Sequence, residues 1–382
     1  MTSTPLRILH LSQRAFWCGE SNRVRVVCKG LHERDWPVVL GAPPTSALAS
    51  VAQDEGIPVD TRFEFRGGFR PASIRRDVRA LRQCQQEGQF HIIHLHTSVD
   101  TWIAALAFGF QRGRQRPLLI RTRHSDHASR SDPIHRWLYG RAIDHVILSS
   151  DSLREPLAGL IRSGALTSER MTVIHSSVDL DRFDPSQRNG TAIRKELDLG
   201  ERFCIGLIGR VSREKGHDLL IQAIPALRDV QPDVCCVFVG TGAAEADFRQ
   251  RVQDQGLSDH VRFTGFRKDI AEIMAAMDVI TVPSRRVESS PGVVKEGMAM
   301  SKAVIAADVG GVREIIDHGL NGWVIPRNDA GALTEALVQM IQQPTLREQL
   351  AAQARQRVAD HFSDTHLVDR TLQLYQRLVP TA

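Results

Sequence analysis

Two carboxylates, Glu288 and Glu296, stand on either side of a Ser-Ser-Pro-Gly turn, with seven residues between them. The turn follows an apolar run that ends at Val282, and it precedes residues 293–299, whose composition favours a helix. Carboxylates accept hydrogen bonds and donate none, so they suit a ligand that carries hydroxyl groups. A carboxylate on each side of an anion site would suit a diphosphate with a sugar at both ends, as in a nucleotide sugar.

The turn itself has the residues of a phosphate-binding helix start. Ser290 can cap the helix, Pro291 fits its first turn, and Gly292 lets the backbone approach a ligand closely. The backbone amides of Gly292, Val293 and Val294 would then lack partners within the helix, which suits a phosphate group. Two glutamates at an arbitrary spacing are more often solvated groups on a surface helix. The position after a buried-type strand favours binding, because α/β sheets bind ligands at the carboxyl ends of their strands.

A second stretch, residues 209–216 (GRVSREKG), also follows an apolar run, residues 203–208. Arg210 and Lys215 are cations on either side of a turn, and Gly216 precedes an amphipathic segment. A guanidinium offers a fork of donors to phosphate oxygens, and an ammonium offers a compact charge. Alone, this would be a loop with ordinary surface cations, but the predicted fold places it at the same sheet edge as Glu288 and Glu296.

Histidines follow strands in the first half of the chain. His124 could hydrogen-bond a sugar hydroxyl or a reacting oxygen, although a histidine in such a place is more often structural. His124 and His127 lack a third metal ligand at a standard spacing. His94 and His96 would share one face of a strand, with His91 on the other, so we expect no metal site. Gly240 and Gly242 lack the rest of a dinucleotide fingerprint, which disfavours a dehydrogenase.

The elements that must position these residues alternate between strand-like and helix-like runs, which indicates an α/β fold with parallel sheets covered on both faces. The expected strands are residues 6–11, 38–40, 92–95, 118–122, 146–149 and 172–174, then 203–209, 234–240, 261–264, 278–282, 303–306 and 323–325. The polar segment 178–191 marks a boundary. We therefore expect two Rossmann-like, doubly wound domains, residues 1–185 and 186–362, that face a central cleft, followed by a helix in residues 363–382.

Composition sets limits on partners and compartment. The chain has 382 residues and a net charge of +5, and none of its six cysteines forms a CxxC pair. No run is apolar enough to span a membrane and no signal peptide is evident, so we expect a cytoplasmic protein. Residues 1–185 hold 25 Lys and Arg against 19 Asp and Glu, with arginines clustered in residues 66–82 and 112–123. This basic half suits an anionic membrane surface on its cytoplasmic side, and the scarcity of aromatic residues disfavours nucleic acid.

The motifs together resemble retaining glycosyltransferases of family 4, which have the GT-B fold. They occur in the order of that family: GRVSREKG (209–216), VGTG (239–242), FTGFRKDI (263–270), VPSRRVESSPGVVKEGMAM (282–300) and DVGGVREII (308–316). The first half matches more loosely, through the Gly19 loop, the His94 strand end, the His124 loop and residues 178–183. Cys18 stands where the family often has a second glycine, and Ser-Pro-Gly stands where many members have Phe-Gly.

The resemblance implies a role for each matching residue. Arg210 and Lys215 would bind the donor diphosphate and stabilise it as it leaves, and Glu288 and His124 would contact the sugar. The remaining donor contacts would be Gly19 near the diphosphate, Arg267 at the base, Gly292, Val293 and Val294 at the phosphate or sugar, and Glu296 at the ribose. Gly240 and Pro291 would also belong to the donor site. The first domain would bind the acceptor, the second would bind the donor, and the final helix would return to the first.

The activity implied is a retaining, metal-independent transfer of a hexose-type sugar from a nucleotide sugar, with UDP favoured, to a hydroxyl group of a cell-surface glycan or glycolipid. A lipopolysaccharide core is one such acceptor, and the enzyme would need no cofactor. A nucleotide-sugar 2-epimerase of the same fold and a non-catalytic carbohydrate-binding scaffold are the alternatives. The His124 loop and the ESSPGVVKE motif favour transfer, and the complete set of cations and glutamates disfavours a scaffold.

Overall fold

The chain folds into two units in the computed structural model, which describes residues 5–68, 70–111, 116–286 and 288–379. Unit 1 contains residues 1–176 and 364–382, and unit 2 contains residues 177–363. The boundary therefore lies at Ser176 and not at the expected residue 185. The Val178 amide already donates to the Phe362 carbonyl of unit 2 at 2.9 Å, so the chain has joined unit 2 by Val178. The final helix belongs to unit 1, as expected.

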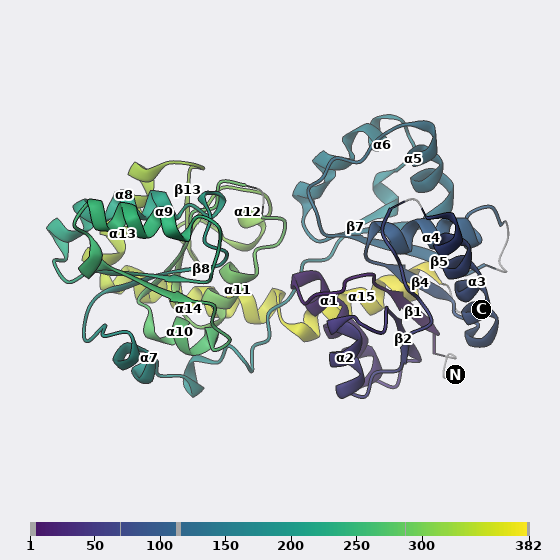
Figure 1. The fold of residues 1–382 in the computed structure, drawn as a ribbon, viewed down its shortest axis with the longest axis horizontal. Helices are drawn as coiled ribbons and strands as arrows, with labels where there is room; N and C mark the ends of the chain where they lie inside the picture. Colours follow the sequence, from purple (N-terminus) through teal and green to yellow (C-terminus); the bar gives the residue numbers. More distant parts are fainter. Residues whose placement is uncertain (1–4, 69, 112–115, 287, 380–382) are drawn as a thin grey trace. The chain divides into compact units, whose positions relative to one another are not determined.

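Unit 1 is a seven-stranded parallel sheet in the order β3-β2-β1-β4-β5-β6-β7 (Figure 1). Its strands are β1 (Ile8–Leu11), β2 (Val38–Gly41), β3 (Val59–Asp60), β4 (Ile92–Leu95), β5 (Leu118–Arg123), β6 (His145–Leu148) and β7 (Met171–Val173). Its α-helices are α1 (Gly19–His32), α2 (Ala47–Asp54), α3 (Pro71–Gly88), α4 (Ser98–Phe108), α5 (Pro133–Trp137), α6 (Ala158–Arg162) and α15 (Asp364–Leu378). The sequence did not single out α2 or β3.

Unit 2 is a six-stranded parallel sheet in the order β10-β9-β8-β11-β12-β13. Its strands are β8 (Cys204–Ile208), β9 (Cys235–Val239), β10 (Val261–Gly265), β11 (Val279–Val282), β12 (Ala303–Ala307) and β13 (Trp323–Ile325). Its α-helices are α7 (Thr191–Glu196), α8 (His217–Val230), α9 (Glu245–Asp254), α10 (Ile270–Ala276), α11 (Gly292–Ala299), α12 (Val312–Ile315), α13 (Ala330–Gln342) and α14 (Pro344–His361).

Each sheet has a hydrophobic core on both faces, because successive strand residues point in opposite directions. In β8, Cys204 packs into the core beneath α10, α11 and α14, whereas Ile205 packs into the core beneath α8, α9 and α13. In β1, Ile8 faces α1, α2 and α15, and Leu9 faces α3 and α4. This burial on both faces accounts for the continuous apolar runs in the sequence.

The order of strands reverses between β1 and β4 in unit 1, and between β8 and β11 in unit 2. Ligands of doubly wound sheets bind beside such switch points, at the carboxyl ends of the strands. The fold therefore singles out one edge position in each unit. Among the described residues, no helix combines the length and the apolar character needed to cross a lipid bilayer.

Candidate active site

The two loops at the switch point of unit 2 are held together by a close backbone contact. Gly216 follows the turn Arg213–Lys215 and begins α8 with φ +78°, a left-handed conformation that favours glycine. A Cβ atom there would lie 2.2 Å from the Pro283 carbonyl oxygen, so only glycine allows this approach. The Arg285 amide also donates to the Glu214 carbonyl at 2.7 Å. The predicted shared edge is thus formed by direct contact between the loops.

An ion pair between Lys215 and Glu288 lies at the centre of this edge. The Lys215 ammonium donates a hydrogen bond to Glu288 Oε1, and the Ser284 hydroxyl donates to the same oxygen at 2.8 Å. The side chains of Lys215 and Glu288 are 29% and 20% exposed, so the pair is partly shielded from water but open to a ligand. The backbone fixes Glu288 as well, because its carbonyl accepts a hydrogen bond from the Gly311 amide at 2.9 Å.

The N-terminus of α11 lies beside this pair in the sequence and presents free amides. Pro291 is the N-cap residue, in an extended conformation, and makes no side-chain capping bond. The helix cap is therefore Pro291, one position later than the expected Ser290. The first-turn amides of Gly292, Val293 and Val294 have no acceptors within the helix, and its dipole favours an anion there.

Glu296 folds back over the first turn of α11. A Cβ atom on Gly292 would lie 3.6 Å from Glu296 Oε1, so the carboxylate and the Gly292 backbone face the same space. Burial raises the pKa of Glu296, and the charges of Arg182 and Lys295 act against this effect. A half-buried carboxylate with an elevated pKa suits a ligand hydroxyl, which can donate to it.

A buried lysine that sequence reasoning did not single out supports this turn. Lys295 is fully buried, and its ammonium donates to the Ser290 hydroxyl at 2.9 Å and lies 5.9 Å from the centre of the Phe362 ring. Its position between two valines and Glu296 on a short helix does not distinguish it from a surface lysine. Lys295 therefore fixes the Ser-Ser-Pro-Gly turn from inside unit 2.

Three other predicted donor contacts have defined partners. Arg210 is exposed and pairs with Glu214 at 3.2 Å, so its guanidinium can reorient toward a ligand. Gly240 lies against the loop after β8, where a Cβ atom would be 2.1 Å from the Gly209 carbonyl oxygen. Arg267, in the loop after β10, forms ion pairs with Glu196 at the end of α7 and with Asp269. Their contacts with a donor stay predictions.

Unit 1 positions Gly19 and His124 at the carboxyl ends of its own strands. Gly19 begins α1, and a Cβ atom on it would meet nothing within 4 Å, which leaves space for a ligand. His124 follows β5, and burial lowers its pKa, with further lowering by the charges of Arg23, Arg14 and Arg121. His124 is therefore neutral at physiological pH and can accept or donate one hydrogen bond.

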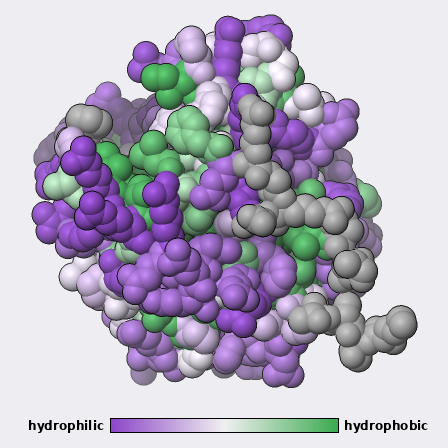
Figure 2. Space-filling model, turned by 90° about the vertical axis from the view of Figure 1, so that its right-hand side faces the viewer, coloured by the Kyte–Doolittle hydropathy of each residue, from purple (hydrophilic) through white to green (hydrophobic). Residues whose placement is uncertain are grey.

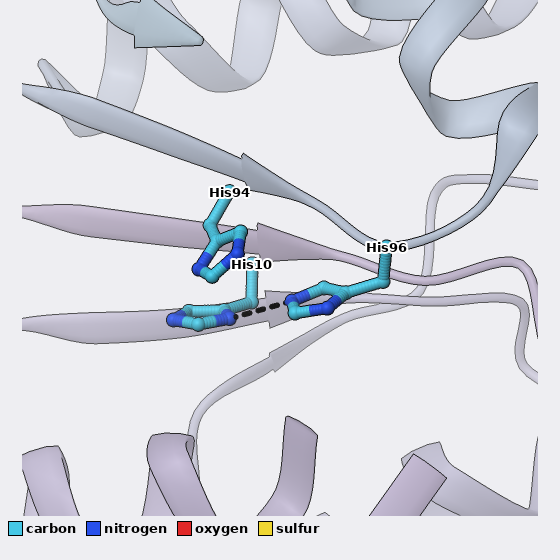
Figure 3. A group of neighbouring side chains, drawn as sticks. All are labelled: His10, His94 and His96. Atoms are coloured by element: carbon cyan, nitrogen blue, oxygen red, sulfur yellow. Dashed lines mark hydrogen bonds between the residues drawn. The ribbon is translucent and has the colours of Figure 1, made fainter. Parts of the chain in front are cut away.

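Three buried histidines meet at the switch point of unit 1 (Figure 3). His10 of β1 lies in register with His94 of β4, and His10 Nδ1 is 3.0 Å from His96 Nε2. One ring nitrogen from each of the three lies within 4.8 Å of the others, a spacing that could hold a metal ion. His91 is separate and accepts a hydrogen bond from the Arg7 amide. The third histidine of this group, His10, comes from another strand and was not singled out from the sequence.

Comparison with known proteins gives two family models that together span most of the chain. Residues 18–182 match Glycosyltransferase Family 4, and residues 190–357 match Glycosyl transferases group 1. A protein of Bacillus subtilis named as glycosyltransferase EpsD is 29% identical over 91% of both chains. The lipopolysaccharide core biosynthesis mannosyltransferase LpcC of Rhizobium leguminosarum is 32% identical over 60% of this chain and 62% of its own.

A solved structure shares the architecture. HepE of Anabaena, in complex with UDP, superposes with a TM-score of 0.82 at 22% identity and covers 97% of this chain and 100% of its own. The same protein has been solved with UDP-glucose. At this identity the likeness concerns the fold.

The elevated pKa of Glu296 generates a prediction on stability. A carboxyl group whose pKa is higher in the folded state stabilises the protein most below its unfolded pKa of about 4.5, and this contribution is lost as the pH rises through the folded value. We expect Glu296→Gln to be more stable than the wild type at pH 7 without ligand, and the difference to shrink toward pH 4. Urea unfolding from pH 4 to 8 measures it.

The exposed Glu348 of α14 offers the matched control, because Glu348→Gln removes the same charge without burial. Glu348→Gln should change stability little across this range. A Glu296→Gln variant that is less stable than the wild type at pH 7, by the same amount at every pH, would contradict the assignment of Glu296 as a carboxyl group whose pKa is raised by burial.

Proposed function

The chain belongs to family 4, group 1 of the glycosyltransferases and has the GT-B fold, and we propose that it is a retaining, metal-independent hexosyltransferase. The donor would be a nucleotide sugar, with UDP favoured, and the acceptor a hydroxyl group of a cell-surface glycan or glycolipid. The observation that carries the proposal is the ion pair of Lys215 and Glu288 at the switch point of unit 2, beside the first turn of α11 in sequence.

The leaving diphosphate gathers negative charge as the glycosidic bond breaks, and pre-organised cations stabilise it. Lys215 can supply that charge because Glu288 and the loop contact at Gly216 hold it in place. Arg210 can turn from Glu214 to the phosphate, and the amides of α11 supply further donors. Glu288 and Glu296 can accept hydrogen bonds from sugar hydroxyls. This set of groups needs no metal ion for charge neutralisation, and the acceptor hydroxyl would attack from the face of the leaving group.

The nature of donor and acceptor is supported by relatives. HepE binds UDP and UDP-glucose in its solved structures, which favours a uridine nucleotide here. LpcC is a lipopolysaccharide core mannosyltransferase, which favours a glycolipid acceptor of that kind. An acceptor anchored in a membrane would bring the enzyme to the inner face of the cytoplasmic membrane.

The surface of unit 1 supports such a peripheral contact. Arg75, Arg79 and Arg82 lie three or four residues apart along α3, so they share one face and are exposed. Arg82 donates to carbonyls at the end of α4, where Phe110 is 72% exposed and stacks on Trp137 at 4.6 Å. Figure 2 shows the side of unit 1 that lies at the right in Figure 1, with apolar groups among a mainly hydrophilic surface. Basic and aromatic groups side by side suit an anionic lipid surface.

Loss of either member of the ion pair should lower turnover. We expect Lys215→Ala and Glu288→Ala each to reduce kcat by on the order of a hundredfold or more, as for loss of a group that stabilises transition-state charge. Product formation from a nucleotide sugar and a glycolipid acceptor is the measurement, and it also separates transfer from epimerisation, which needs no acceptor. Arg213→Ala is the control, because Arg213 is exposed on the same turn and faces Asp247 at 3.6 Å.

Near wild-type turnover of Lys215→Ala would remove Lys215 from the site. If neither the wild type nor the variant transfers sugar, but both still bind a glycan, the result would support the carbohydrate-binding scaffold instead.

Membrane contact should depend on the α3 face. We expect the protein to sediment with vesicles that contain phosphatidylglycerol at low salt, and the double variant Arg75→Ala, Arg79→Ala to bind at least tenfold more weakly, at about 1 kcal/mol per arginine. A second double variant, Arg228→Ala, Arg327→Ala, removes the same charge from exposed positions of unit 2 and should bind as the wild type does. Equal binding by all three proteins would contradict a contact through α3.

A further inference from the structure

Arg23 of α1 is a buried cation without a counterion. Its side chain belongs to a residue that is 3% exposed, and its Nη1 atom has no hydrogen-bond partner. Among the described residues, none forms an ion pair with it. Burial lowers the pKa of Arg23 to about 10, and the one group that opposes this is Tyr375, a phenol that is neutral at pH 7. A buried charge left in this state destabilises the fold unless something else neutralises it.

The histidines of the switch point lie on the face of the sheet that α1 covers. His10 and His94 follow Ile8 and Ile92 by two residues, so they share the face that packs against α1 and α15. The positive charge of Arg23 contributes to lowering the pKa of His94, His96 and His124. The ring centres of His96 and His124 lie 5.9 Å apart. Like Arg23, His96 is buried, and its Nδ1 atom has no hydrogen-bond partner. Two buried nitrogen atoms thus lack a hydrogen-bond partner in the described part of the chain, one on α1 and one directly after β4.

A chain of hydrogen bonds ends at that His96 nitrogen. Thr122 Oγ1 lies 2.6 Å from His94 Nε2, and His94 Nδ1 lies 2.5 Å from the Tyr375 hydroxyl. The same hydroxyl lies 3.3 Å from His10 Nε2, and His10 Nδ1 lies 3.0 Å from His96 Nε2. With each imidazole neutral, the chain can run in either direction. If the chain of hydrogen bonds runs toward His96, each group donates a hydrogen bond to the next. His96 Nδ1 then carries a proton that it can donate to a ligand.

These contacts favour an anion over a metal ion. Both ring nitrogens of His10 and of His94 are engaged in the chain, so a metal would have to break it. The charge of Arg23 would also repel a divalent cation, whereas it attracts a phosphate or a carboxylate. In addition, the switch point of a doubly wound sheet is where such ligands bind.

We propose that Arg23 and His96 Nδ1 bind an anionic group, a phosphate or a carboxylate, on the acceptor of the reaction. The inference rests on the proposed function for the identity of that ligand as an acceptor. The donor diphosphate has its own cations, Lys215 and Arg210, in unit 2. The anionic group neutralises Arg23 and accepts the His96 proton, so a neutral acceptor of the same shape binds more weakly.

The test uses inorganic phosphate and glucuronate as separate probes, at constant ionic strength, on full-length Lys215→Ala, whose donor site is impaired. We expect phosphate, glucuronate or both to raise Tm and to shift the His96 imidazole resonances in ¹⁵N-labelled protein. Adding Arg23→Met should weaken the apparent affinity at least tenfold and should leave Tm without ligand equal or higher, because an uncompensated buried charge is removed. Arg23→Gln serves as a second variant.

Adding Arg25→Met instead provides the matched control, because Arg25 lies on the same helix and pairs with Glu55 at 2.8 Å. This variant should keep the response to the probes. A response that survives Arg23→Met and Arg23→Gln, or no response to either probe, would overturn the proposal. The titration needs neither a donor nor turnover, so a negative titration would contradict the anion site without contradicting the proposed transferase activity. Conversely, normal turnover of Lys215→Ala would contradict the role of Lys215 without contradicting the anion site.

Discussion

The donor site depends on the close approach of two loops, where Gly216 lies against the carbonyl oxygen of Pro283. No side chain fits there, since a Cβ atom would be 2.2 Å from that oxygen. The contact has a direct consequence for charge, because it brings Lys215, the residue before Gly216, to Glu288, which follows Pro283 by five positions. Backbone packing thus holds together an ion pair whose own attraction, at partial exposure to water, would be modest.

Much of this could be predicted because it depends on local sequence. Alternating apolar runs fixed the strands to within a few residues, and parallel sheets bring the carboxyl ends of neighbouring strands to one edge, which is how Lys215 and Glu288 were placed together. The domain boundary and the helix cap were harder to predict. Val178 is already tied to Phe362, a partner distant in the sequence, and Pro291 takes the cap position next to the expected Ser290.

The residues that sequence reasoning missed all depend on pairing between distant segments. His10 lies in an ordinary apolar strand, and only its register with β4 brings it to His94 and His96. Arg23 and Lys295 look like surface residues of amphipathic helices, and their burial follows from how those helices pack. Both switch points therefore carry buried cations. In unit 2, Lys295 donates to Ser290, whereas in unit 1 the Nη1 atom of Arg23 has no hydrogen-bond partner among the described residues.

The central claim, that unit 2 binds a nucleoside diphosphate sugar through Lys215, is tested most directly by thermal shift. The wild type and Lys215→Ala would be compared with UDP-, GDP-, ADP- and CMP-sugars, since a ligand of the folded state raises Tm by mass action. The predicted result is a rise in Tm with one diphosphate series, UDP-sugars first, that is lost in the variant. Equal shifts in both proteins, or no shift with any donor, would contradict the claim.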